Sequence, residues 1–229
     1  MVDVVKHHPM KTYGQFCGLA RALDVIGDRW NLLIVRELIA GPLRYTELRT
    51  SLAGVATNLL ADRLRTLETF GVVERRVAEG GVAYALTPWG EGLRAPLEAL
   101  VRWSAPLMVT GGEGEVFRPR WLVLALPALL AGVTASPPAV VGVEVAGTVV
   151  VLRVDAGGVH AELGAEDDVP DTLLSAPPAM LLGLAAGALG VDEVVAAGHL
   201  SGDADALRRA FPAERRRPVC GPTAADPSA

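Results

Sequence analysis

Six polar residues in the first half of the chain have the chemistry that DNA recognition uses. They are Thr57, Asn58, Arg63, Arg65, Arg75 and Arg76. Hydroxyl and amide groups hydrogen-bond to base edges in a DNA groove, and guanidinium groups bind base edges or phosphates. The same residue types also occur on ordinary amphipathic helices with solvated arginines. The elements that position these residues therefore decide between the two interpretations.

The spacing of apolar residues predicts two helices at the start of the chain. Leu19, Leu23 and Ile26 share one helical face. We expect Gly27 to end this helix in the left-handed conformation and Asp28 to cap the next one. The second helix should stop at the glycine-proline pair that follows it, because proline cannot continue a helix.

A short helix, a turn and a longer helix come next. The short helix is expected over residues 45–52 and the turn over 53–54. Thr57 is the expected N-cap of the longer helix, which runs to about Phe70 because Gly71 ends it.

The longer helix has the two faces that a DNA recognition helix needs. Its buried stripe consists of Leu60, Leu64 and Leu67. Thr57 and Asn58 stand at the N-terminal end, which is the end that meets base edges in the major groove. We expect Arg63 and Arg65 to reach phosphates.

Two short strands joined by a glycine turn follow this helix. They are expected over residues 72–77 and 82–86, because the glycines between them supply the positive φ of a tight turn. Arg75 and Arg76 place positive charge beside the turn, where a wing contacts the sugar-phosphate backbone. The order of these elements is typical of a winged helix-turn-helix, and it favours DNA binding over a merely solvated surface.

A further helix is expected after the hairpin. Thr87 should cap it, Pro88 should open it, and Pro96 should bend it. Its apolar stripe consists of Trp89, Leu93, Leu97, Leu100, Leu107 and Met108. Because such a helix has little of its own domain to pack on, we expect it to form a dimer interface, with core packing as the alternative.

These segments together resemble the HxlR family of MarR-related winged-helix transcriptional regulators, which act as homodimers. The resemblance covers about residues 14–109 and is carried, in order, by ALDVIGDRW, LIVREL, GPLRYTEL, LLADRLRTLE, GVVERR and YALTPWG. It implies that a homodimer binds a palindromic operator in double-stranded DNA.

One position departs from the family, which often has Cys-Pro near the start of the first helix. Here Gly18 follows Cys17. A cysteine at a helix N-terminus can have a lowered pKa and react as a thiolate, which makes Cys17 a candidate redox sensor. The alternative is an unreactive small core residue.

Charge is distributed unevenly between the two halves of the chain. Residues 1–110 carry 13 Lys and Arg against 11 Asp and Glu, a net charge of +2, whereas residues 111–229 carry 8 against 15, a net charge of −7. The overall net charge of −5 therefore does not oppose DNA binding. We expect the acidic half to face away from phosphate.

The second half predicts an α+β domain. An apolar helix interrupted by Pro127 precedes three valine-rich strands, over residues 140–145, 149–154 and 159–163, which we expect to form an antiparallel meander. A fourth strand is expected near 171–174. Short apolar helices and a closing helix over 203–211 should cover one face of the antiparallel sheet.

This order resembles the sterol carrier protein fold, mainly through the phrase AAGHLSGDADALRRAF. The resemblance implies an apolar tunnel between sheet and helices that captures a lipid-like or other apolar small molecule. The candidate ligand-binding residues are Trp121, Leu124, Met180, Leu181 and Leu184. Ligand pockets are mostly apolar, but each of these residues would serve equally well in an ordinary core.

The remaining patterns argue against several other classes of protein. No catalytic constellation or nucleotide-binding motif is present, so we expect neither an enzyme nor a cofactor. His160 and Glu162 are interpreted as a surface pair rather than a metal site. The longest apolar stretches are shorter than the ~20 residues of a membrane span. Without a secretory signal, the chain is expected in the cytoplasm.

The chain therefore reads as a multi-domain protein. We expect a mainly α winged helix-turn-helix domain for DNA binding and dimerisation over 1–110, a linker over 111–117, the sterol-carrier-like domain over 118–211 and a disordered tail over 212–229. The predicted function is a dimeric DNA-binding regulator controlled by an apolar small molecule. Two alternatives stay open: a lipid-carrier or accessory protein that uses the winged helix for protein contacts, and a regulator whose second domain only braces the dimer.

Overall fold

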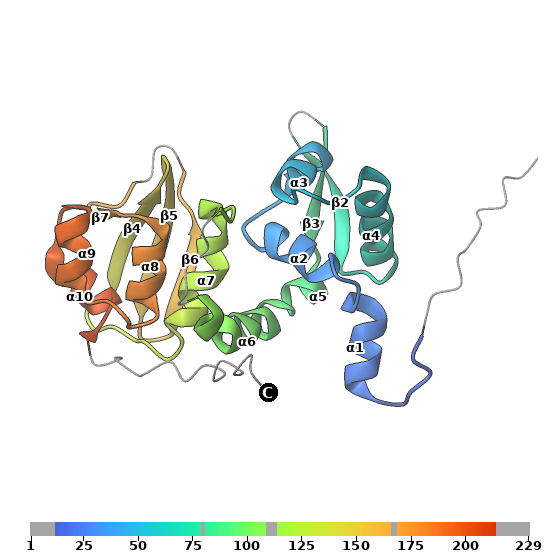
Figure 1. Ribbon diagram of the computed structural model, residues 1–229, viewed down its shortest axis with the longest axis horizontal. Helices are drawn as coiled ribbons and strands as arrows, with labels where there is room; N and C mark the ends of the chain where they lie inside the picture. The colour runs from blue at the N-terminus through green and yellow to red at the C-terminus, as the bar shows by residue number, and fades with distance from the viewer. Residues whose placement is uncertain (1–11, 79–80, 109–113, 166–168, 214–229) are drawn as a thin grey trace, which may run out of the picture. The chain divides into compact units, whose positions relative to one another are not determined.

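The computed structural model describes residues 12–78, 81–108, 114–165 and 169–213. The chain divides into two compact units, Met1–Leu93 and Arg94–Ala229 (Figure 1). The expected hairpin turn at Glu79 and Gly80, residues 111–113 of the expected linker 111–117 and nearly all of the expected tail lie outside the described residues.

The first unit has the predicted order of a winged helix-turn-helix. Its elements are α1 (Gly18–Ile26), α2 (Asn31–Ile39), β1 (Leu43–Arg44), α3 (Tyr45–Ser51), α4 (Thr57–Thr69), β2 (Val73–Ala78), β3 (Gly81–Leu86) and α5 (Pro88–Glu91). The hairpin β2–β3 is joined by β1 in an antiparallel sheet of order β1-β3-β2. Strand β1 was not predicted, because two residues carry no alternating pattern.

The core of this unit is built from the predicted apolar stripes. Leu60, Leu64 and Leu67 of α4 are buried, and so are Ile34 and Leu38 of α2. Gly71 takes a φ of +68° directly after α4 and lets the chain turn into β2, as its position predicts.

Three helix boundaries differ from expectation. Gly27 has a φ of −69° rather than a left-handed value, because its N–H continues the helical pattern to the carbonyl of Leu23. Asp28 does not cap α2, which begins three residues later with Trp30 at the N-cap. Thr57 is the first residue inside α4, and Ala56 takes the N-cap position without a side-chain bond.

The helix expected after the wing is broken in two. Thr87 caps α5 as predicted, since its Oγ1 accepts a hydrogen bond from the N–H of Gly90 at 3.0 Å. Gly92 and Leu93 then form a turn, and α6 (Arg94–Ser104) begins as part of the second unit. The break therefore precedes Pro96, which lies in the first turn of α6, where its missing N–H is not needed. The boundary between the two compact units falls between Leu93 and Arg94. The expected domain boundary after residue 110 stays a prediction.

The second unit combines helices with a five-stranded sheet. Its other elements are η1 (Ala105–Met108), η2 (Pro119–Trp121), α7 (Leu122–Leu129), β4 (Ala139–Val145), β5 (Thr148–Asp155), β6 (Gly158–Leu163), β7 (Leu173–Ser175), α8 (Pro178–Ala185), α9 (Val191–Ala197), β8 (His199–Ser201) and α10 (Ala204–Ala210). The strand order is β6-β5-β4-β7-β8.

The sheet is mixed rather than antiparallel throughout. The meander β4–β5–β6 forms as predicted, but β7 pairs with β4 in parallel, with Gly142 opposite Leu173. After β6 the chain crosses to the far side of β4, which brings β7 alongside in the same direction as β4. Gly142 permits this close approach, because a Cβ there would lie 2.7 Å from Leu173 Cδ1. The antiparallel strand β8 was not foreseen, because its three residues carry no strand pattern.

One face of the sheet carries the core of this unit. Val141 and Val143 of β4 and Val150, Leu152 and Val154 of β5 are buried, and α7 and α10 pack against these strands (Figure 1). This confirms the α+β class, whereas the likeness to sterol carriers stays a prediction. No helix within the described ranges is long and apolar enough to cross a membrane.

Candidate nucleic-acid interface

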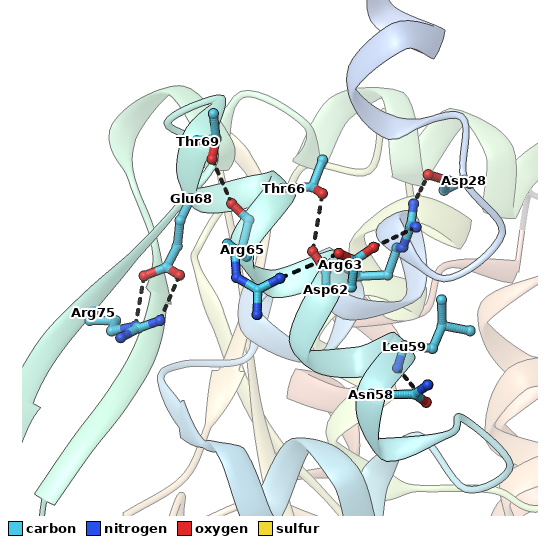
Figure 2. A network of polar contacts seen from close by, with 10 residues as sticks. All are labelled: Asp28, Asn58, Leu59, Asp62, Arg63, Arg65, Thr66, Glu68, Thr69 and Arg75. Carbon is cyan, nitrogen blue, oxygen red and sulfur yellow. Dashed lines mark hydrogen bonds and ion pairs between the residues drawn. The ribbon is translucent and has the colours of Figure 1, made fainter. Parts of the chain in front are cut away.

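Helix α4 presents a continuous polar face opposite its buried leucines. Asn58, Asp62, Arg65 and Thr69 recur at helical spacing, and all four are exposed. Figure 2 shows these side chains along α4, with Arg75 of the neighbouring strand β2 beside them. An exposed polar helix face on a rigid core is the surface that a DNA groove requires.

Two hydrogen bonds hold the N-terminal turn of this helix in place. The carbonyl of Thr57 accepts a hydrogen bond from Tyr45 Oη at 2.7 Å, which links α4 to α3. Asn58 Oδ1 accepts from the N–H of Leu59 at 2.9 Å. Both Thr57 and Asn58 are exposed, as the sequence predicts for residues that meet base edges.

Arg63 does not lie on the polar face. Its side chain is only 18% exposed and forms ion pairs with Asp28 and, at 2.8 Å, with Asp62. The expectation that Arg63 reaches phosphate therefore does not fit its surroundings, because two carboxylates already hold its guanidinium. Asp28 serves as this partner instead of capping α2.

Arg65 lies on the polar face and is 68% exposed. Its Nη1 is 3.4 Å from Asp62 Oδ1, one turn earlier on the same helix. This single contact leaves most of the guanidinium accessible.

The two wing arginines point to opposite faces of the hairpin, because they are adjacent in a strand. Arg75 Nε and Nη2 contact the two carboxylate oxygens of Glu68, at 2.8 and 3.0 Å, and its guanidinium lies 5.5 Å from the Tyr84 ring centroid. The hydrogen bond that Arg75 donates to the Glu68 carboxylate raises the pKa of Arg75 above its ordinary value. Arg76 Nε instead pairs with Glu74 at 2.7 Å.

Sequence reasoning missed the carboxylates of this surface. Asp62 and Glu68 each hold an arginine that had been interpreted as free to contact DNA. The spacing of Asp62 and Arg65 is a helical pair that the sequence displays, but the link from Glu68 to the wing depends on tertiary packing.

Cys17 stands at the N-cap of α1 and is exposed. Hydrogen bonds from the backbone of Ala20 and Leu19 lower the pKa of its thiol. The expectation of a reactive environment is thereby supported over that of a core residue, whereas a redox role stays a prediction.

A cavity of about 560 Å³ lies beside α1 in the first unit. Its apolar lining includes Val25, Phe70, Trp89 and Leu93. Several large apolar side chains of the same unit are exposed to solvent, namely Phe16, Leu19, Leu23 and Trp89. Such a concentration of exposed apolar surface is typical of a protein interface.

One candidate ligand residue of the second unit, Leu184, lines a cavity in this unit. A cavity of about 340 Å³ is lined by Leu184, Leu189, Val191, Phe211 and neighbouring polar residues. Its lining does not include Trp121, Leu124, Met180 or Leu181. Leu124 and Leu181 are buried core residues, and Trp121 packs edge-to-face on Phe117 with centroids 6.1 Å apart. Glu162, expected as a surface residue, pairs with Arg153 at 3.2 Å.

Known proteins resemble the first part of this chain. Residues 25–110 match the HxlR-like helix-turn-helix family. The uncharacterized HTH-type transcriptional regulator YkvN of Bacillus subtilis (strain 168) is 32% identical over 112 residues, which cover 46% of this chain and 95% of YkvN. The HTH-type transcriptional regulator YodB of the same organism is 35% identical over 86 residues, covering 36% and 77%.

A solved structure of the reduced form of YodB is 31% identical and covers 43% of this chain and all of that one, with a TM-score of 0.37. YkvN and YodB are matched over most of their own lengths and above 30% identity. This chain therefore belongs to the HxlR-like helix-turn-helix family of transcriptional regulators.

Proposed function

We propose that this protein is a homodimeric transcriptional regulator that inserts α4 into the major groove of a palindromic operator. The observation that carries the proposal is the exposed face of Asn58, Asp62, Arg65 and Thr69, set opposite a buried leucine stripe. A rigid helix with one polar face can present hydrogen-bonding groups to base edges without rearranging its core.

The polar residues divide by position into two roles. Thr57, Asn58 and Arg65 contact base edges, because they lie on the exposed part of α4. For Arg65 this replaces the phosphate contact expected from the sequence. Arg75 and Arg76 contact phosphates from the wing, each exchanging a carboxylate of Glu68 or Glu74 for a phosphate oxygen. This exchange keeps the guanidinium groups paired both before and after binding, so that neither state leaves them without an acceptor.

Dimerisation is supported by the apolar surface around α1. Phe16, Leu19 and Trp89 expose large side chains beside a cavity of about 560 Å³. A second copy that packs here would bury this surface and give the two-fold symmetry that a palindromic site requires. The relatives are bacterial proteins, so we propose that the dimer acts on chromosomal DNA in the cytoplasm.

The test is a selection of genomic DNA fragments by the purified full-length chain, followed by affinity measurement at several salt concentrations. We expect a palindromic sequence to be enriched and its affinity to fall steeply with salt, because phosphate contacts release counterions. An accessory protein that uses the winged helix for protein contacts would enrich no sequence, and that result would contradict the proposal.

A second proposal concerns ligand control. The cavity lined by Leu184, Leu189 and Phe211 supports binding of an apolar small molecule to the second unit. Fluorescent fatty acids should bind saturably, and Leu184→Trp should abolish binding by filling the cavity. Absence of saturable binding would favour a unit that only braces the dimer.

A further inference from the structure

We propose that Asp62 is the specificity-determining residue of the DNA-reading face, because it positions Arg65 and is itself positioned through Arg63 and Asp28. The inference rests on the proposed insertion of α4 into the major groove. It assigns a function to an acidic residue on a surface that approaches phosphate, where a carboxylate otherwise weakens binding.

Asp62 lies in the middle of the polar face and uses both of its oxygens. Its side chain is 51% exposed. Oδ1 is 3.4 Å from Arg65 Nη1, and Oδ2 is 2.8 Å from Arg63 Nη2. Figure 2 shows Asp62 between the two arginines on α4.

Arg63 connects Asp62 to a different part of the fold. Its other Nη pairs with Asp28, in the segment between α1 and α2. Arg63 Nε is buried and has no hydrogen-bond acceptor within the described part of the chain, so the terminal nitrogens make the side chain's polar contacts. Asp28, Arg63, Asp62 and Arg65 thus form a continuous series of ion pairs from the α1–α2 segment to the polar face.

This series restrains Arg65, the arginine of the polar face. A solvated arginine adopts many rotamers, and a DNA contact must then fix one of them at an entropic cost. The Asp62 carboxylate, one turn earlier on α4, reduces the number of Arg65 rotamers in the free protein. Because Asp62 contacts a single Nη, the other guanidinium nitrogens remain available for a guanine, which arginine contacts through two hydrogen bonds.

The negative charge of Asp62 also lowers the affinity for DNA sequences that offer Arg65 no matching base. The repulsion between the Asp62 carboxylate and the DNA phosphates is present on every sequence. Where Arg65 finds its base, the hydrogen bonds to that base offset this repulsion, and where it does not, no base contact offsets it. A like-charge contact of this kind lowers the affinity for incorrect partners more than for the correct one.

The decisive variant is Asp62→Asn in the full-length chain. Its affinity is compared with that of the wild type for the selected operator duplex and for a shuffled duplex of equal length. We expect affinity for the shuffled duplex to rise roughly two- to fivefold, the scale of one exposed charge interaction. The ratio of operator to shuffled affinity should fall about tenfold, the lower part of the range for one base contact.

The matched control is Glu74→Gln. It also removes one exposed carboxylate from an arginine, namely Arg76, but on the wing instead of on α4. Its effect should be the same on both duplexes and leave their ratio unchanged. If Glu74→Gln changed the affinity ratio as much as Asp62→Asn does, then removing any exposed carboxylate would have the same effect on sequence discrimination. That result would overturn the assignment of Asp62.

Arg63 provides the test of the positioning role. Arg63→Met should lower the affinity ratio while leaving the salt dependence of operator binding unchanged, and Arg63→Lys should restore part of the ratio because it keeps the charge beside Asp28. If Arg63 instead contacts phosphate, the slope against salt should fall by about one in Arg63→Met. That result would contradict the series of ion pairs.

The outcomes separate this inference from the function on which it rests. A wild-type protein that does not discriminate the selected duplex from the shuffled one overturns both. A wild-type protein that discriminates, together with an Asp62→Asn variant of unchanged ratio and unchanged thermal stability, overturns only the role of Asp62.

Discussion

The two units place their candidate functional residues in opposite environments. In the first unit, Asn58, Arg65 and Arg76 stand on exposed surface and are held by nearby polar groups. In the second unit, Leu124 and Leu181 are sealed inside the core. A polar residue is exposed because water or a binding partner must solvate it, so its position on the surface indicates where a partner can bind. An apolar residue is buried whether or not a ligand is present, so its type alone does not indicate binding.

The largest effect expected from this comparison is on the stability of the second unit. Leu181→Ala should lower the free energy of unfolding by about 2–5 kcal/mol, because Leu181 is 1% exposed and its truncation leaves a cavity. Urea unfolding followed by circular dichroism would measure the loss. Arg65→Ala serves as the control and should unfold like the wild type. A stability change below about 0.5 kcal/mol for Leu181→Ala would show that the residue faces open space.

The next effect is on operator binding. Arg65→Ala should weaken specific binding by about 1–3 kcal/mol, because it removes an exposed side chain from the polar face. Asn58→Ala should have a smaller effect of the same kind, since its Oδ1 already accepts the Leu59 N–H. Fluorescence anisotropy with the selected duplex would measure both. Unchanged affinity in both variants would move the reading surface away from α4.

The two wing arginines of the first unit should differ in their effect on stability. Arg76→Ala should reduce the slope of log affinity against log salt by about one and leave sequence discrimination intact, because it removes one phosphate contact. Arg75→Ala should show the same change of slope and additionally destabilise the fold, because Arg75 joins the wing to Glu68 of α4. Thermal unfolding would detect this difference. Identical melting of the two variants would contradict the joining role of Arg75.

Features of the fold that depend on residues close together in the sequence could be predicted, whereas features that depend on distant residues could not. The leucine stripe of α4, the Thr87 cap and the valine-rich meander depend on local spacing, and the sequence displays them. The left-handed turn expected at Gly27 was wrong, because its N–H continues the helical pattern to the carbonyl of Leu23. The cap expected at Asp28 was also wrong, because an arginine 35 positions further along the chain, Arg63, pairs with the Asp28 carboxylate. The parallel pairing of β7 was missed for a similar reason, since the crossover from β6 has no local signature.

The candidate site shows the same limit. Thr57, Asn58 and Arg65 lie on the exposed surface that the helical pattern predicts. The burial of Arg63 was not visible, because its position flanks the apolar stripe and depends on what packs beside it. Which arginines are free for DNA is decided by Asp62, Glu68 and Glu74, whose pairings are properties of the folded structure.

The smallest expected effect concerns Cys17. The backbone N–H groups at the start of α1 favour the thiolate, so the pKa of Cys17 is lowered in the folded chain. A lowered pKa means that the thiolate is populated at lower pH than in the unfolded chain. The alkylation rate by iodoacetamide, measured against pH by mass spectrometry, should therefore reach half its maximum at a lower pH in the folded protein than in urea. Coincident pH profiles would remove the basis for a redox role.

Dimethyl sulfate methylates guanine N7 in the major groove, so footprinting with this reagent on the selected operator reports whether α4 reads bases there. If it does, guanines in two half-sites about one helical turn apart should be protected, and protection at one position in each half-site should be lost in Arg65→Ala. Protection that is absent from the major groove, or that persists unchanged in Arg65→Ala, would contradict the assignment of α4 as the element that reads DNA.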